Sequence, residues 1–182
     1  MSRPRYLFVT FSLLALSACS QVQITIPYTP QTTKEIKGRV AVSDFGYYPK
    51  GGLKENEIHD TAAGQIFLTD PVGKFIADAV RREFRQAGLS LKSGGCSLEG
   101  EVNDFTLDEL GYSADYITDI RYILNGANKH VLLDNTYHVK FHASKFVQPA
   151  VVMANLNKAV ADNIAQLLDD PAFVTAVESK CR

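Results

Sequence analysis

The strongest periodic signal in the chain is a helix-spaced stripe of apolar residues between positions 72 and 88, with charged residues on the opposite side. Asp70-Pro71 supplies a start signal, in which Asp70 is the predicted N-cap and Pro71 the first helical residue, and Gly88 supplies the stop. The pattern predicts an amphipathic helix with one face in the core. Its apolar stripe consists of Val72, Phe75, Ile76, Ala79, Val80, Phe84 and Ala87.

Two further helices are predicted near the C-terminus. A second apolar stripe at helical spacing follows Gln148-Pro149 and runs to about Leu167. Asp170-Pro171 repeats the start signal and predicts a short last helix that ends near Ser179. Because each long helix has one apolar face to bury, we expect the two of them to cover one face of a sheet.

Alternating apolar and polar positions predict four strands, within residues 36–45, 98–107, 116–124 and 137–143. The second of these changes parity at Asn103-Asp104, which predicts a β-bulge. The order of elements is therefore β-α-β-β-β-α-α. This order indicates an α+β fold, with a mostly antiparallel four-stranded sheet and two helices packed on one face.

Residues 46–69 are the least regular part of the predicted domain, because glycine and proline interrupt them repeatedly. A loop of this length inside a compact domain is usually functional or disordered. Two interpretations remain open: its apolar side chains cover the core, or they bind a partner. For the second interpretation the candidate partner-binding residues are Tyr47, Tyr48 and Leu53.

The N-terminus has the three parts of a secretory signal peptide: Arg3 and Arg5, an apolar run over residues 6–16, and a small-residue exit. The exit, Leu16-Ser17-Ala18-Cys19, resembles the lipobox of bacterial lipoproteins. In a lipobox the cysteine thiol receives a diacylglycerol and the chain is cut just before it. The alternatives are a plain secretory signal and a membrane-spanning helix, which needs about 20 apolar residues.

The lipobox interpretation divides the chain into a signal peptide at 1–18, a lipidated tether at 19–34 and a single periplasmic domain at 35–182. Cys19 is the predicted lipidation site, and two or more acyl chains hold a protein firmly on a membrane. Ser20 follows the cysteine where an aspartate would favour retention in the inner membrane. The predicted location is therefore the periplasmic face of the outer membrane.

Composition and charge are those of one ordinary globular domain. The chain has 182 residues, of which 46% are hydrophobic and 21% charged, and its net charge is -1. This charge gives no electrostatic case for binding nucleic acid or anionic lipid. We therefore expect contact with the membrane through the lipid anchor, an envelope protein as partner, and no nucleic acid.

If Cys19 is acylated, Cys96 and Cys181 are the two cysteines that remain. An even number in an oxidising compartment predicts a disulfide, which would close a loop of more than eighty residues. The alternative is a pair of free thiols.

The chain lacks a nucleotide-binding loop, a nucleophile elbow, a zinc-protease pair and a CxxC motif. His138 and His142 share a strand face, but four residues of strand span about 13 Å, which is too far for both rings to bind one metal ion. Nothing in the spacing brings Asp44 together with His59-Asp60 as a base and its orienting group. No catalytic residue, metal site or cofactor is predicted, and the protein is not expected to be an enzyme.

The chain resembles the YajG family of periplasmic lipoproteins. The resemblance lies in the lipobox, the helix over 72–88, the strand Leu98-Glu99-Gly100-Glu101-Val102, the hairpin over 120–139 and the helical segment at 157–163. The loop at 46–69 and the two late cysteines depart from that family. The layout is also similar to auxiliary lipoproteins of lipid-transporting ABC systems and to lipoprotein activators of peptidoglycan synthases. None of these families implies a catalytic residue.

Three functional hypotheses follow. The leading one is a non-enzymatic outer-membrane lipoprotein that acts as a binding or interaction module in the cell envelope. The alternative is an auxiliary lipoprotein subunit of an envelope phospholipid ABC transport system, which would require an apolar groove between sheet and helices. The third is a peptidoglycan hydrolase that uses Asp44 and His59.

Overall fold

The computed structural model describes residues 23–49, 51–61 and 65–182. The predicted signal peptide at 1–18 and the predicted lipidation site Cys19 lie outside the described residues. Among the helices in the described part of the chain, none combines the length and the apolar character that crossing a bilayer requires.

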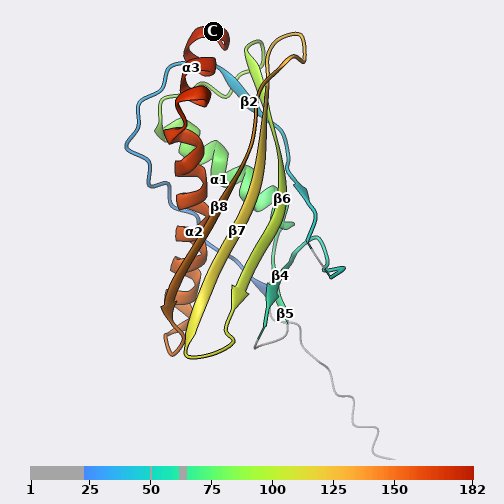
Figure 1. The fold of residues 1–182 in the computed structure, drawn as a ribbon, viewed down its shortest axis with the longest axis vertical. Helices are drawn as coiled ribbons and strands as arrows, with labels where there is room; N and C mark the ends of the chain where they lie inside the picture. Colours follow the sequence, from blue (N-terminus) through green and yellow to red (C-terminus); the bar gives the residue numbers. More distant parts are fainter. Residues whose placement is uncertain (1–22, 50, 62–64) are drawn as a thin grey trace, which may run out of the picture.

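The fold is one mixed sheet with its helices gathered on one face (Figure 1). Three long strands, β6 (Cys96–Asp108), β7 (Ser113–Asn125) and β8 (Val131–Ser144), form an antiparallel meander. The helices are α1 (Val72–Gln86), α2 (Pro149–Asp169) and α3 (Pro171–Lys180). The short strands are β1 (Gln23–Ile24), β2 (Val40–Val42), β3 (Gly46–Tyr47), β4 (Glu57–Asp60) and β5 (Gln65–Leu68).

The α+β class is as predicted, but the predicted sheet was too small and too uniformly antiparallel. The described residues form eight strands in the order β1-β5-β4-β6-β7-β8, and β2 and β3 also pair with β6. The parallel pairs are β1 with β5 and each of β2, β3 and β4 with β6. β7 pairs with one edge of β6, and without further strands the other edge would leave a long row of backbone donors and acceptors without partners. The segment before α1 satisfies them with three short strands placed one after another.

The predicted bulge in β6 is confirmed, because the register with β7 shifts between Val102 and Asp104. Beyond the bulge, Phe105 and Leu107 are buried in the core. Successive strand residues alternate between faces, so Asp104, Thr106 and Asp108 belong to the opposite face. The bulge therefore determines which side chains of β6 are available away from the helices.

The helix boundaries follow the predicted signals with one correction. Pro71, not Asp70, occupies the N-cap position of α1, and no side chain caps the helix. Asp70 instead forms an ion pair of 3.0 Å with Lys74. Gly88 ends the helical segment with a φ of +86°, a conformation that glycine adopts freely. Asp170 caps α3 as predicted, since its Oδ1 accepts a hydrogen bond from the backbone N–H of Ala172 at 2.7 Å.

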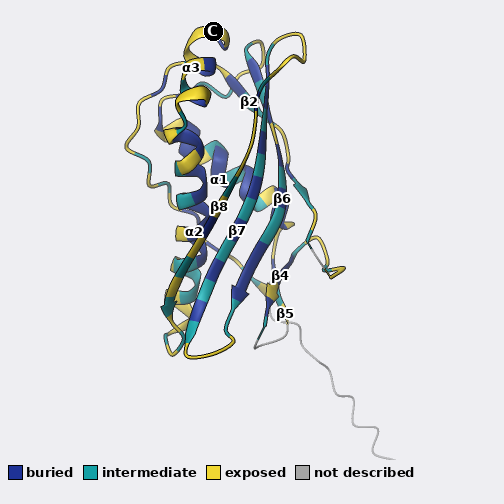
Figure 2. Ribbon diagram, in the orientation of Figure 1, coloured by how far each residue is buried: buried dark blue, intermediate teal, exposed yellow. Residues whose placement is uncertain are grey.

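Buried residues line the facing surfaces of the sheet and the helices (Figure 2). Large side chains fill this space, and the following are less than 2% exposed: Phe84, Phe105, Tyr116, Tyr122 and Phe173. Asn163 of α2 is fully buried, and it accepts from the Tyr122 hydroxyl at 2.9 Å and donates to the Tyr137 carbonyl at 2.8 Å. The layer between sheet and helices is thus packed by aromatic residues and joined by a hydrogen-bonded asparagine.

Residues 25–34 correct the predicted boundary between tether and domain. They form neither helix nor strand, but Ile26 and Tyr28 are only 6% and 8% exposed and belong to the core. The Tyr28 hydroxyl donates to Glu83 at 2.6 Å, and the backbone N–H groups of Gln31 and Thr32 donate to the same carboxylate at 2.9 Å. The folded unit therefore begins before residue 35.

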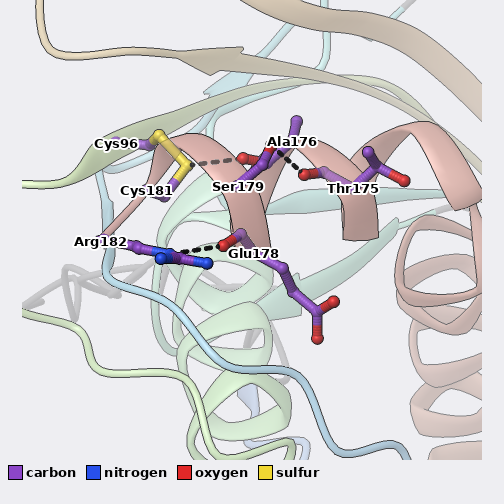
Figure 3. Close-up of a disulfide and its surroundings, with 7 residues drawn as sticks. All are labelled: Cys96, Thr175, Ala176, Glu178, Ser179, Cys181 and Arg182. Carbon is purple, nitrogen blue, oxygen red and sulfur yellow. Dashed lines mark hydrogen bonds between the residues drawn. A yellow bond between two sulfur atoms is a disulfide. The ribbon is translucent and has the colours of Figure 1, made fainter.

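A disulfide joins Cys96 at the start of β6 to Cys181 just after α3, across 85 residues of sequence (Figure 3). Both cysteines are buried. Arg39 lies between the two linked segments, because its backbone N–H donates to the Cys181 carbonyl at 2.6 Å and its carbonyl accepts from the Cys96 N–H at 3.0 Å. Covalent and hydrogen bonds together attach the C-terminus to the sheet.

Candidate functional site

A cleft of about 250 Å³ lies beside the end of β6, where β4 and the segment after β3 meet it. Asp104, Thr106 and Asp108 of β6 line it. They lie on the face of the sheet opposite the helices, because the bulge sets the alternation of side chains beyond Val102. Its lining residues are Tyr47, Pro49, Leu53, His59, Thr61, Asp104, Thr106 and Asp108.

Two carboxylates form the acidic part of the cleft. Asp104 accepts a hydrogen bond of 2.5 Å from the hydroxyl of Thr106, and Asp108 accepts one of 2.7 Å from the hydroxyl of Thr61. The backbone N–H of Leu110 also donates to Asp108, and this bond, followed by the one from Thr61, lowers the pKa of Asp108. Both groups are therefore held in place as acceptors, and Asp108 stays ionised well into the acid range.

Tyr47 and Leu53 form the apolar part. The Tyr47 hydroxyl donates to the Glu57 carbonyl at 2.8 Å, and the ring packs partly against the core. Burial, and after it the negative charges of Asp104 and Glu57, raises the pKa of Tyr47 well above its ordinary value, so the hydroxyl remains a neutral donor. Leu53 is half-buried.

The structure brings two of the three predicted partner-binding residues to this cleft. Tyr48 lies next to them in sequence, does not line the cleft and is 63% exposed. Its backbone N–H donates to the Val102 carbonyl at 2.8 Å, which holds the segment along β6. Tyr47 thus covers core residues, as the first interpretation expects, while Tyr48 and Leu53 are accessible and partner binding stays a prediction.

The base and orienting group considered for a hydrolase are not assembled. Asp44 accepts a hydrogen bond of 2.8 Å from Arg81 of α1, close to the point where Ser43 bonds to Leu98. His59 pairs instead with Thr106, eight residues further along β6. That separation is roughly 25 Å along the strand. His59 reaches the cleft without Asp44.

His138 and His142 each contact a different carboxylate. His138 lies 3.6 Å from Asp119, and His142 bonds to Asp115. Throughout the described ranges, no three His, Cys, Asp or Glu side chains come together in a group that could hold a metal ion. The two histidines belong to a charged sheet face.

Arg121 is the centre of that charged face, and sequence reasoning did not identify it. Its Nη1 donates to Glu101 at 2.9 Å, while Nε and Nη2 donate to the two oxygens of Asp134 at 2.7 Å each. The paired guanidinium lowers the pKa of Asp134. The three residues come from β6, β7 and β8, so only the strand register places them together.

A second hollow, of about 450 Å³, lies near the C-terminus beside the disulfide and is open to solvent. Its lining residues are Lys37, Gly38, Glu178 and Arg182. Arg182 donates from Nε to the Glu178 carbonyl at 3.0 Å (Figure 3). The hollow lacks the convergent apolar and acidic groups that distinguish the cleft beside β6.

No family model and no curated protein matches this chain. Among solved structures, it is similar to protein XCC0632 from Xanthomonas campestris, described under the family DUF330, with a TM-score of 0.67 and 14% identity over 85% of this chain and 96% of that one. An uncharacterised protein gives a TM-score of 0.55 and 11% identity, over 80% of this chain and 97% of its own. Protein CT253 from Chlamydia trachomatis gives 0.50 and 10%, over 80% and 98%. At these identities the likeness concerns the fold alone.

Proposed function

We propose that the protein is a non-enzymatic lipoprotein, anchored through Cys19 to the periplasmic face of the outer membrane, that binds a segment of another envelope protein. The observation that carries the binding role is the cleft beside β6, which Tyr47 and Leu53 line together with Asp104 and Asp108. The anchoring rests on the lipobox and on Ser20. The pair considered for a hydrolase does not meet in this cleft, because Asp44 bonds to Arg81 while His59 lines the cleft.

The chemistry of the cleft suggests what it binds. Apolar walls beside two carboxylates suit an extended peptide segment that carries an apolar side chain next to a lysine or arginine. The cation would face Asp104 and Asp108, while the apolar side chain would pack on Leu53 and Tyr47. A cleft of this volume holds a few side chains rather than a folded surface, so Tyr48 would widen the contact.

A second candidate is an auxiliary lipoprotein subunit of an envelope phospholipid ABC transport system. The observation that favours it is the arrangement of a long meander with helices on one face. The order of elements in the sequence is similar to that of such auxiliary lipoproteins. The space between sheet and helices is filled by buried aromatic residues. A subunit of this kind would therefore contact transporter proteins through the cleft and would not carry lipid in a groove.

Site-specific crosslinking in the native envelope tests the proposed role. A photoreactive amino acid at Leu53 is expected to capture an envelope protein, whereas one at Val131, which is 48% exposed on β8, is not. Asp104→Asn is expected to reduce the yield at Leu53 severalfold, and Glu99→Gln, which removes an exposed carboxylate elsewhere on β6, is expected to leave it unchanged.

Mass spectrometry of the adduct separates the two candidates, because a transporter subunit would favour the second. Equal yields at Leu53 and Val131, or no effect of Asp104→Asn, would rule out the cleft as the binding site. Labelling with palmitate tests the anchor separately, and unlabelled protein would overturn the location proposed here.

A further inference from the structure

We propose that the protein has a second contact with the membrane, formed by two loops at one end of the sheet. The loops are residues 109–112, between β6 and β7, and residues 145–148, between β8 and α2. We call them the tip. Its exposed apolar side chains, Leu110, Tyr112 and Phe146, would sit in the interface of the same bilayer that holds the acyl groups on Cys19. The inference rests on the proposed lipid anchoring.

The tip concentrates the most exposed large apolar side chains of the described residues. Leu110 is 72% exposed, Tyr112 98% and Phe146 87%. Folded proteins commonly expose single apolar residues, but three together on adjacent loops mark a contact surface. Most of the apolar surface of these side chains faces solvent, so the fold itself does not account for them.

The two loops are held side by side. Ser113 at the start of β7 pairs with Ser144 at the end of β8, and this pairing places Tyr112 and Phe146 just beyond neighbouring strand ends. Lys145 then donates from Nζ to the Glu109 carbonyl at 2.5 Å, which links one loop directly to the other. The apolar side chains therefore project from one braced end, not from two independent loops.

The direction of β1 places the chain entry at this same end. β6 runs toward the tip, and β4 is parallel to β6. β5 is antiparallel to β4, and β1 is parallel to β5. β1 therefore runs away from the tip, and Gln23 is at the end of β1 that is nearer to the tip. Figure 1 shows β4 and β5 near the end of the molecule where the loop between β6 and β7 lies.

The reach of the chain fits this arrangement. The strand register relates Gln23 to β6 in two steps. Gln23 and Glu57 both pair with Phe67, so they are level with each other. Glu57 comes two residues before His59, which pairs with Thr106. Gln23 is thus level with about residue 104 of β6. Four further residues of β6 add about 13 Å toward the tip. The four residues from Cys19 to Gln23 span at most about 14 Å, so an anchor at Cys19 keeps the tip within reach of the bilayer.

The side chains of the tip suit a bilayer interface. Tyrosine and phenylalanine are favoured where apolar chains meet polar headgroups, and leucine adds apolar surface. Glu109 and Lys145 carry opposite charges, so the tip offers no net electrostatic attraction. Insertion is therefore expected to occur in zwitterionic lipid and to change little with salt concentration.

A single tryptophan tests the proposal directly, because the chain contains none. Tyr112→Trp places a reporter in the tip, and His130→Trp places one in the exposed turn at the other end of β7, about 40 Å away. In full-length lipidated protein reconstituted into phosphatidylethanolamine–phosphatidylcholine vesicles, the emission of the reporter at position 112 is expected to shift to the blue and to be quenched by brominated lipids. The emission of the reporter at position 130 is expected to be unchanged.

Two further substitutions test the role of the neighbouring side chains. With Leu110→Ser and Phe146→Ser added to Tyr112→Trp, the ratio of inserted to free tip is expected to fall roughly 100-fold, because burying each such side chain changes that equilibrium about tenfold. Quenching at position 112 should then approach that at position 130. Quenching at position 112 that survives both substitutions would overturn the proposal, as would equal quenching at the two reporter positions.

The outcomes separate the tip from the anchor. Protein shown by mass spectrometry to carry lipid, whose reporter at position 112 is not quenched, would refute the tip and leave the anchor standing. Unlipidated protein with a quenched reporter would refute the anchor alone. A blue shift that appears without vesicles and grows with protein concentration would assign the tip to contact between two copies of the chain, and would also overturn the proposal.

Discussion

Removing the disulfide with the double substitution Cys96→Ala and Cys181→Ala is expected to lower the free energy of unfolding by about 4.6 kcal/mol. The two cysteines are 85 residues apart. In the chain-entropy model, closing a loop of that length restricts the unfolded chain by about 15 cal/mol/K, which is about 4.6 kcal/mol at 25 °C. Because single domains unfold at a cost of about 5–15 kcal/mol, the variant should be only marginally stable.

The native contacts around the bond indicate that the fold itself survives. The backbone hydrogen bonds of Arg39 to both segments do not involve the sulfurs, so we expect them to remain in the variant. Urea unfolding followed by circular dichroism should therefore give a cooperative transition at a lower midpoint. The melting temperature is expected to fall by about 9–18 °C, at about 2–4 °C for each kcal/mol in a chain of this size.

Two observations would refute this reasoning. One is a loss of less than about 1 kcal/mol in the double variant, far below the chain-entropy value. The other is a large loss without an increase in the m-value, because a chain freed from an 85-residue loop expands and exposes more surface when unfolded. Cys19→Ser serves as the control, since it removes a cysteine outside the bond and should leave the unfolding curve unchanged.

Three further changes probe other parts of the fold. Glu83→Ala removes a buried carboxylate that accepts three hydrogen bonds from residues 28–32; urea unfolding should show a loss of about 2–4 kcal/mol, and limited proteolysis should cut residues 25–34 faster. The hydrogen bond from Tyr137 lowers the pKa of Asp170. The stability that ionised Asp170 contributes is therefore present above about pH 4 and lost as the pH falls toward the lowered folded-state pKa. Asp170→Asn should make the free energy of unfolding depend less on pH between about pH 5 and 2. Gly73→Ala places a Cβ 2.0 Å from the Phe45 carbonyl oxygen, and calorimetry should show a net loss of about 1–3 kcal/mol despite the higher helix propensity of alanine.

The long elements could be predicted because their periodicity extends over many residues. The stripe in α1 and the alternation in β6, β7 and β8 each repeat several times, so one irregular position does not hide them. The bulge at Asn103-Asp104 was visible for the same reason, as a change of parity within a long pattern. Among the short strands, β2 lies within the strand predicted at 36–45. The others were not predicted, because two to four residues carry no measurable period.

One missed segment did contain a signal. Ile24, Ile26 and Tyr28 alternate with polar or proline positions, which is the period of an extended chain with one buried face. The prolines at 27 and 30 favoured the interpretation as a tether. Burial in the core, and the bonds to Glu83, depend on where α1 lies, which no local pattern contains.

Some residues of the candidate site could be identified from the sequence and others could not. Tyr47 and Leu53 stood out by composition, as apolar residues in an irregular segment. Asp104 and Asp108 did not, because alternating polar residues on a strand usually face solvent. They meet Tyr47 through the parallel pairing of β3 with β6, which joins Tyr47 with Val102, and they meet His59 through the pairing of β4 with β6. Non-local pairing of this kind is the step that sequence patterns do not provide.

The bulge in β6 connects the two features on which the proposals depend, the cleft and the tip. If the strand continued past Val102 in strict alternation, without the bulge, Phe105 and Leu107 would leave the core while Asp104 and Thr106 entered it. The same strand then ends at the tip, so the cleft and the tip lie within a few residues of each other at the end where the chain enters β1. Under the proposed anchoring and tip contact, a partner bound in the cleft would therefore be held close to the membrane.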